Sequence, residues 1–183
     1  MKIVRTWPHK IPKGRGHVLD DLPRYMMGGF DYRPFFKHVD DDVLIVEWDI
    51  AVGAEHFADM LDLIATDQAS VHAAPYRLYT MPSYPGPHWV MRRFDAAGEL
   101  QWCEDSDTSS HTFGFGFTYV PRDLWRAYEA EIPRRLSWVN DSNFSKWHHL
   151  NVAAEVPIPW HIRPVHLHYP VPETARGVCD GSA

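Results

Sequence analysis

The sequence has little cysteine, no long apolar run and no excess of basic residues. Cys103 and Cys179 are far apart and belong to no CxxC pair, which excludes a disulfide framework and favours a reducing compartment. No apolar stretch approaches the ~20 residues that span a bilayer, and residues 1–8 lack the apolar run of a signal peptide. We therefore expect a cytoplasmic protein with no membrane span.

The composition favours one globular domain over residues 1–183. At roughly 150 residues per domain, the length leaves no room for two. The net charge of −6 argues against a broad nucleic-acid surface. Aromatic residues are abundant, with 8 Trp, 8 Tyr and 9 Phe, and there are 12 histidines. These rings suit either a ligand site with stacked aromatics or an aromatic core.

Apolar patterning predicts an α/β fold in which helices flank a mixed sheet. The run Val43–Val46 is continuously apolar, which is typical of a strand buried on both faces. A helix beginning at Ala54 follows from apolar positions three and four residues apart: Phe57, Met60, Leu61, Ile64 and Ala65. Further strands are predicted over 2–7, 71–79, 88–94, 113–120 and 162–169, and further helices over 121–135 and 142–155. Residues 10–29 are expected to be irregular, with turns at 81–87 and 95–98.

Two acidic residues follow the apolar run, in the sequence Glu47-Trp48-Asp49. Residues two apart on an extended chain point the same way, so these carboxylates are placed to share a cation at the end of a central strand. Paired oxygen ligands suit Mg²⁺ or Mn²⁺. The alternative, that both acids are simply solvated at a strand end, stays open. For the acidic run at 40–42 and the pair Asp105 and Asp107, a polar loop is the preferred interpretation.

Three more features carry possible chemistry. His166 and His168 lie two apart on a predicted strand, which suits either metal ligands or half-buried structural histidines. Asp141 begins a predicted helix, where it is either an N-cap or a general base. Gly114 and Gly116 alternate with aromatic residues, which predicts a strand that something approaches closely.

The order of these features resembles the catalytic half of a GT-A-fold glycosyltransferase, over about residues 41–169. Glu47-Trp48-Asp49 is similar to the D-x-D-type motif that holds a metal and the diphosphate of a nucleotide sugar. The segment containing Gly114 and Gly116 is similar to the strand near the donor sugar. Asp141 matches the position of the base, and His166, with His168 as the alternative, that of a further metal ligand.

The resemblance implies a GT-A-like, Rossmann-like architecture with residues 1–42 as a reduced nucleotide-binding part, 43–170 as the metal- and acceptor-binding part and 171–183 as a tail. It also implies transfer of a sugar from a nucleotide-diphosphate donor, with inversion, to a hydroxyl of a protein, glycan or modified nucleic acid. Mn²⁺ or Mg²⁺ would be held by Glu47, Asp49 and His166, with Asp141 as the base.

The donor would contact residues at the end of the first strand, beside the acidic motif and at the glycines: Thr6, Trp7, Trp48, Gly114 and Gly116. Two alternatives are a His/carboxylate metal hydrolase or oxygenase, and a non-catalytic carbohydrate-binding module. Basic residues near the N-terminus, Arg5 among them, are expected mainly at the solvated surface.

Overall fold

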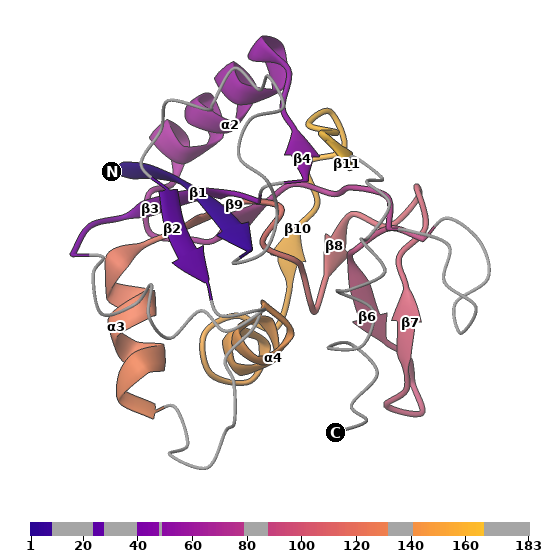
Figure 1. Ribbon diagram of the computed structural model, residues 1–183. Coiled ribbons are helices and arrows are strands. Elements are labelled where there is room, and N and C mark those ends of the chain that lie inside the picture. Colours follow the sequence, from indigo (N-terminus) through magenta and orange to yellow (C-terminus); the bar gives the residue numbers. More distant parts are fainter. Residues whose placement is uncertain (9–23, 28–39, 48, 79–87, 132–140, 167–183) are drawn as a thin grey trace, which may run out of the picture.

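The computed structural model describes residues 1–8, 24–27, 40–47, 49–78, 88–131 and 141–166. For residues 6–8 and 24–27 it describes the backbone. Within these ranges the chain forms a mixed α/β fold (Figure 1).

A five-stranded sheet lies at the centre of the fold, with the strand order β2-β1-β3-β9-β5. Its strands are β1 (Lys2–Pro8), β2 (Arg24–Met27), β3 (Val43–Val46), β5 (His72–Ala73) and β9 (Phe117–Val120). β1 pairs in parallel with both β2 and β3. β9 runs antiparallel to both β3 and β5. The sheet therefore contains three parallel strands on one side and two antiparallel pairings on the other.

β3 is the central strand, and all four of its residues are 0% exposed. Strands β1 and β9 pair with its backbone on both sides, and its side chains are buried on both faces of the sheet, which favours a continuously apolar run. In register, Val46 lies opposite Arg5 of β1 and Phe117 of β9. This confirms the strand predicted for residues 43–46.

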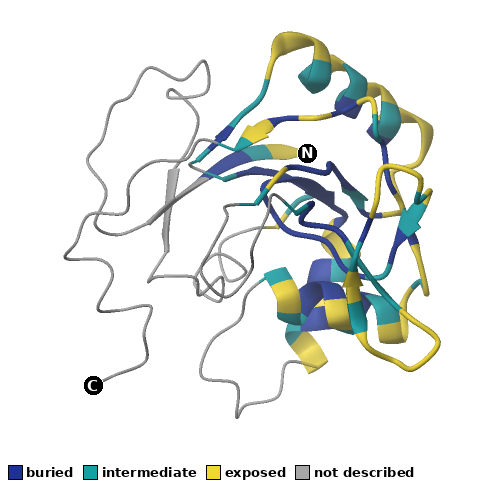
Figure 2. Ribbon diagram, turned by 90° about the vertical axis from the view of Figure 1, so that its right-hand side faces the viewer, coloured by how far each residue is buried: buried dark blue, intermediate teal, exposed yellow. Residues whose placement is uncertain are grey.

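Helices cover both faces of the sheet, as Figures 1 and 2 show from two directions. α2 (Ala54–Thr66) lies on one face, and α3 (Arg122–Glu131) and α4 (Asp141–Asn151) lie on the other. α2 buries Met60 and Ile64, and the ring of Phe57 stacks on Phe117 with centroids 6.1 Å apart. On the opposite face, Phe144 of α4 packs against Trp125 of α3.

Three pairs of short strands extend the fold beyond the main sheet. β6 (Arg92–Phe94) pairs with β7 (Leu100–Trp102), β8 (Ser109–Ser110) with β10 (Val156–Pro157), and β4 (Ile50–Ala51) with β11 (Val165–His166). The β6–β7 hairpin turns at Asp95–Gly98, where Gly98 has φ +81°, a conformation that favours glycine. The predicted turn is thus confirmed.

The structure corrects several predicted boundaries. Arg24–Met27, expected to be irregular, forms β2 because β1 supplies its hydrogen-bonding partner. Within 113–120 only Phe117–Val120 is a strand, and within 71–79 only His72–Ala73. Ala65, predicted on the apolar face of its helix, is exposed. Residues 81–87 lie outside the described ranges.

No helix in the described ranges is long and apolar enough to cross a membrane.

Candidate functional site: three carboxylates around Tyr76

The end of β3 fixes the first predicted ligand, Glu47. Its backbone N–H donates to the carbonyl of Gly116 at 2.8 Å, and its own carbonyl accepts from the N–H of Ile50 at 3.1 Å. These two bonds hold the turn between β3 and β4. Glu47 therefore lies at the carboxyl end of the central strand, as its position in the sequence predicted. Trp48 lies outside the described residues.

Asp49 is paired with His166, a contact between residues 117 positions apart in the sequence. The antiparallel pairing of β4 with β11 places His166 opposite Ile50, next to Asp49. The Nε2 atom of His166 lies 3.0 Å from Oδ2 of Asp49, and the side chains are 8% and 13% exposed. The structure thus brings together two of the three predicted metal ligands.

The other ring nitrogen of His166 determines what this pair can do. Nδ1 lies 3.0 Å from the backbone carbonyl of Arg77, which can only accept a hydrogen bond. Nδ1 therefore carries a proton. Nε2 and Oδ2 of Asp49 face each other, so either a proton or a cation between these two atoms would bond to both.

The donor atoms of Asp49 and His166 fit a divalent cation. A metal-bound histidine commonly donates its other N–H to a carbonyl, as His166 does to Arg77. The 3.0 Å separation is also close to the edge of about 2.9 Å between neighbouring ligands in an octahedral Mg²⁺ site.

Glu47 is not gathered with these two ligands. Among the described residues no three His, Cys, Asp or Glu side chains form a group that could hold a metal ion. His168, the alternative imidazole, lies outside the described residues.

Tyr76 was not predicted and lies at the centre of the site. It is 3% exposed, and its ring centroid lies 5.5 Å from that of His166. A Cβ atom added at Gly114 would be 2.4 Å from its hydroxyl oxygen, and one at Gly116 would be 2.3 Å from its ring. Both glycines therefore allow the backbone to approach Tyr76. The contact with Tyr76 therefore explains why both positions are occupied by glycine.

The pKa of the Tyr76 phenol reports the charges around it. Burial raises this pKa well above its ordinary value, and the negative charges of Glu47, Asp141 and Asp49 raise it further. A hydrogen bond with the backbone of Gly116 acts in the opposite direction. The phenol thus remains protonated, and the three carboxylates predicted from the sequence all act on it.

Asp141 is the first residue of α4 and faces the same point as Tyr76. Its Oδ2 would lie 3.3 Å from a Cβ added at Gly114, the position that also meets the Tyr76 hydroxyl. Oδ1 accepts from the N–H of Ser142 at 2.6 Å. Burial raises the pKa of Asp141, although the hydrogen bonds of Ser142 and the charge of Arg92 lower it. A carboxylate with a raised pKa is a stronger base.

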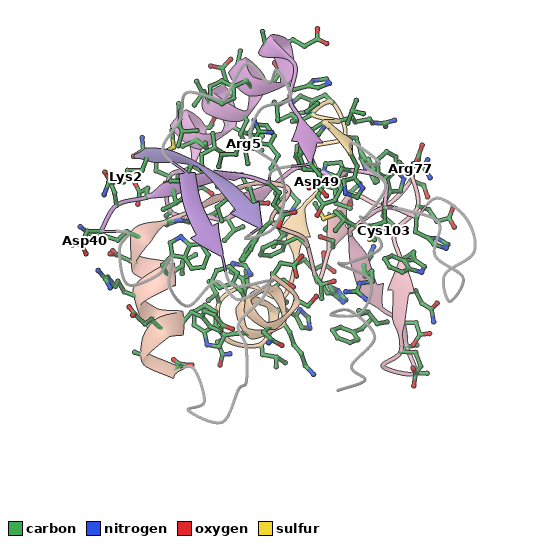
Figure 3. The ribbon with its side chains drawn as sticks, in the orientation of Figure 1. Lys2, Arg5, Asp40, Asp49, Arg77 and Cys103 are labelled. Atoms are coloured by element: carbon green, nitrogen blue, oxygen red, sulfur yellow. The ribbon has the colours of Figure 1, made fainter. Side chains whose placement is uncertain are left out.

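The amino-terminal strand contributes a residue whose environment was wrongly expected. Arg5 is 1% exposed and lies opposite Val46, although the sequence favoured a solvated surface (Figure 3). The error arises because the burial of a strand side chain depends on what packs over that face of the sheet, which the residues next to Arg5 in the sequence do not show. Thr6 and Trp7 follow at the end of β1, where the structure describes the backbone and not the side chains.

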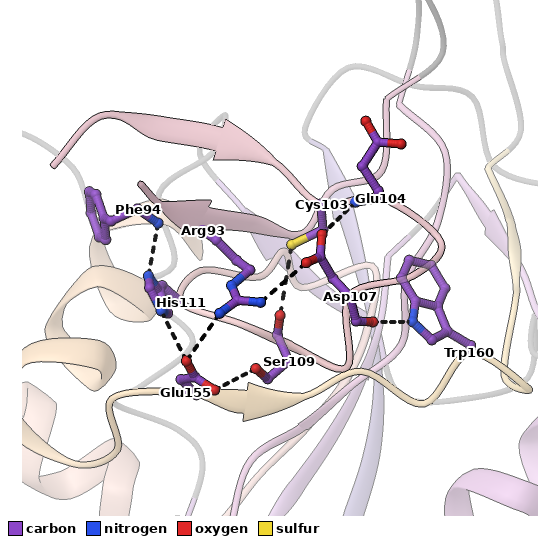
Figure 4. Close-up of polar contacts among 9 residues, drawn as sticks. All are labelled: Arg93, Phe94, Cys103, Glu104, Asp107, Ser109, His111, Glu155 and Trp160. Carbon is purple, nitrogen blue, oxygen red and sulfur yellow. Dashed lines mark hydrogen bonds and ion pairs between the residues drawn. The ribbon is translucent and has the colours of Figure 1, made fainter. Parts of the chain in front are cut away.

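Asp105 and Asp107 do not form a second carboxylate pair at this site. Asp105 accepts from Nε1 of Trp89 at 2.6 Å, whereas Asp107 accepts from Arg93 at 3.1 Å. Figure 4 shows Arg93 between Asp107 and Glu155, in a polar cluster that joins β6, β8 and the start of β10. These acids hold loops together, as the preferred interpretation stated.

Comparison with known protein families finds no match, and comparison with curated proteins finds none. Among solved structures, the crystal structure of A197 from STIV is similar to this chain, with a TM-score of 0.46 and 16% sequence identity. The similarity covers 91% of this chain and 82% of that one. Similarity at this level does not define a fold family.

Proposed function

We propose that this protein is a metal-dependent glycosyltransferase of GT-A-like architecture that moves a sugar from a nucleotide-diphosphate donor to a hydroxyl. The observation that carries the proposal is the pairing of Asp49 with His166 beside Tyr76, whose hydroxyl faces Gly114 together with Asp141. Parallel strands β2, β1 and β3 end at the same edge of the sheet, where open α/β sheets bind ligands.

Asp49 and His166 are the residues that would hold Mn²⁺ or Mg²⁺. Such a cation supplies Lewis-acid stabilisation of the negative charge on a departing diphosphate. With the cation bound, the Nδ1–H of His166 would still donate to the Arg77 carbonyl. This hydrogen bond fixes the orientation of the ring. Glu47 adds a further negative charge beside the site.

Asp141 is the base in this proposal. It takes the proton of the acceptor hydroxyl while the oxygen forms a bond to the anomeric carbon of the donor. The bond from that carbon to the diphosphate oxygen breaks, and the nucleoside diphosphate leaves with the electron pair. One displacement by one nucleophile inverts the anomeric carbon. Tyr76, protonated at neutral pH, is available as a hydrogen-bond donor next to Asp141.

A hydrolase or oxygenase with a three-ligand metal centre is the alternative function. A facial triad requires two histidines and one carboxylate. His166 beside Asp49 supplies one histidine and one carboxylate, and His168, the second histidine of this alternative, lies outside the described residues. Elemental analysis of the purified protein separates the two functions, because the triad predicts bound Zn or Fe and the transferase Mn or Mg.

The test is a melting-temperature screen with nucleoside diphosphates, with and without Mn²⁺. We expect at least one diphosphate to raise the melting temperature only when Mn²⁺ is present, because a ligand at 100 times its Kd stabilises the native state by about 2.7 kcal/mol. Asp49→Asn should lose this shift and sugar transfer while keeping the fold, since the amide oxygen can still accept from His166.

Asp141→Asn is the matched variant, because the same change at the base should keep the Mn²⁺-dependent shift and lose transfer. Absence of any shift with any diphosphate would contradict the proposal. Full turnover by Asp49→Asn would show that Asp49 is not a ligand.

A further inference from the structure

A pocket of about 310 Å³ is lined by Arg77, the residue whose carbonyl contacts His166. Its lining includes Arg77, His88, Trp89, Trp102, Glu104 and Asp105. The carbonyl of Arg77 accepts from His166, while its side chain lines this pocket. Asp49, Arg77 and Cys103, the last also in the pocket lining, are labelled in Figure 3. Arg77 is therefore the residue that connects the pocket with the Asp49–His166 pair.

Flat, ordered rings form the walls of the pocket. The imidazole of His88 stacks on Trp102 with centroids 4.9 Å apart and an angle of 9° between the planes. The guanidinium carbon of Arg77 lies 4.0 Å from the centroid of the Trp89 ring. Because these contacts hold the rings in place, little side-chain entropy remains to be lost on binding.

Hydrogen-bonding groups of both kinds line the same space. Asp105 is held by Nε1 of Trp89 at 2.6 Å and by Arg77 at 3.8 Å, yet its side chain is 59% exposed. Arg77 is 45% exposed, and Glu104 is exposed. The pocket therefore offers carboxylate acceptors next to guanidinium donors, which a hydroxyl group can use at once because it both donates and accepts.

Charges of both signs surround the pocket. Its lining carries the carboxylates of Glu104 and Asp105 and the guanidinium of Arg77. Two more guanidiniums lie on its rings, Arg163 at 5.4 Å from the Trp89 centroid and Arg92 at 5.0 Å from that of Trp102. Because neither sign dominates, the lining does not select for a charged ligand. Cys103 also supplies no covalent chemistry, because burial, reinforced by the charge of Asp107, raises the pKa of its thiol to about 12. These properties fit reversible binding of an uncharged ligand.

We propose that this pocket binds a neutral saccharide, whose hydroxyls bond to Asp105, Glu104 and Arg77 and whose C–H face packs beside the stacked rings of His88 and Trp102. Trp89 is 6% exposed and its face is covered by Arg77, so it shapes the wall without offering a stacking face. The volume lies within the range of small-molecule sites. The role of this saccharide as the acceptor rests on the proposed function. Saccharide binding itself requires neither metal nor nucleotide.

The experiment titrates the purified full chain with a panel of neutral disaccharides containing glucose, galactose or N-acetylglucosamine in α- and β-linkage. Intrinsic tryptophan fluorescence reports binding at Trp89 and Trp102, and saturation-transfer NMR reports which sugar protons are in contact. We expect at least one disaccharide to bind saturably without Mn²⁺ or nucleotide. Asp105→Asn and Glu104→Gln should each weaken its Kd at least five-fold, because a carboxylate accepts hydroxyl hydrogen bonds more strongly than an amide.

Glu99→Gln, at an exposed carboxylate of the neighbouring hairpin, is the matched control and should leave the Kd unchanged. No saturable binding by any disaccharide would overturn the proposal, and so would binding that neither pocket variant weakens. Tighter binding of a nucleoside than of any disaccharide at this pocket would also overturn it. Saccharide binding without any nucleotide-dependent shift would uphold the pocket and contradict the transferase, so the two failures are distinguishable.

Discussion

At the scale of single residues, Gly114 and Gly116 show how tightly the site is packed. Both face Tyr76, which is 3% exposed. A side chain at either position would meet atoms closer than 3.0 Å, including Cγ2 of Val90 at 2.6 Å from position 114. Neighbours this close must shift before a methyl group can fit.

We expect Gly114→Ala and Gly116→Ala each to lower the free energy of unfolding by about 1–3 kcal/mol, the usual cost of overpacking a core. Denaturant unfolding followed by tryptophan fluorescence measures the change. Gly53→Ala is the control, because its Cβ would meet no atom nearer than 4.0 Å. Equal stability of Gly53→Ala and Gly114→Ala would show that Tyr76 is not fixed against this backbone.

At the scale of elements, Asp42, which directly precedes β3, connects this strand with β1 and α3. Its carbonyl accepts from the N–H of Lys2 at the start of β1, and its Oδ1 accepts from the N–H of Arg122, the first residue of α3, at 2.9 Å. The side chain therefore satisfies a donor at a helix start, as an N-cap does, although it comes from 80 residues away. The interpretation of residues 40–42 as a polar loop did not predict this role of Asp42.

Asp42→Ala should cost about 1 kcal/mol of unfolding free energy, the typical effect of losing a cap, and Asp42→Asn should recover most of it. Equilibrium denaturation of the three proteins at pH 7 gives the comparison. Asp40→Ala serves as the control from the same acidic run, because it removes only an exposed ion pair with Arg126 and should have a smaller effect. If Asp40→Ala costs as much as Asp42→Ala, capping of α3 is not the reason.

At the scale of the whole molecule, buried titratable groups link folding to pH. His148 of α4 is 3% exposed, and burial, together with the neighbouring His149, lowers its pKa from 6.5 to about 4. Its ring packs edge-on against Phe113, with centroids 5.7 Å apart. The native state therefore holds His148 neutral, whereas the unfolded chain binds a proton near pH 6.5.

The sign of the effect follows from linkage. The contribution of neutral His148 is fully present above about pH 6.5 and is lost as the pH falls towards 4, by at most about 3 kcal/mol. His148→Leu should flatten the dependence of unfolding free energy on pH over this range, as measured by urea unfolding at several pH values. Parallel curves for the wild type and the variant would rule out His148 as the cause.

The local sequence pattern determined those helices and strands whose periodicity can be recognised within a few consecutive residues. The apolar run 43–46 and the helical spacing from Ala54 specify β3 and α2, because a fully buried strand and an amphipathic helix each impose their own periodicity. The positions of Glu47 and Asp141, at the end of a strand and the start of a helix, followed from the same signals. Strands of two residues, such as β4 and β11, are too short to carry such a pattern.

Only the tertiary structure decided which side chains meet. Asp49 reaches His166 because β4 pairs with β11, and Tyr76 lies among the carboxylates because the backbone at Gly114 and Gly116 leaves room for its ring. Arg5 is buried because its position in β1 places it inside the folded sheet, which its neighbours in the sequence do not show. Each of these contacts joins segments distant in the chain, and their free energy depends on packing across the whole sheet. The sequence alone determined the elements and the order of the acidic residues along the chain, whereas long-range pairing decided their convergence on one phenol.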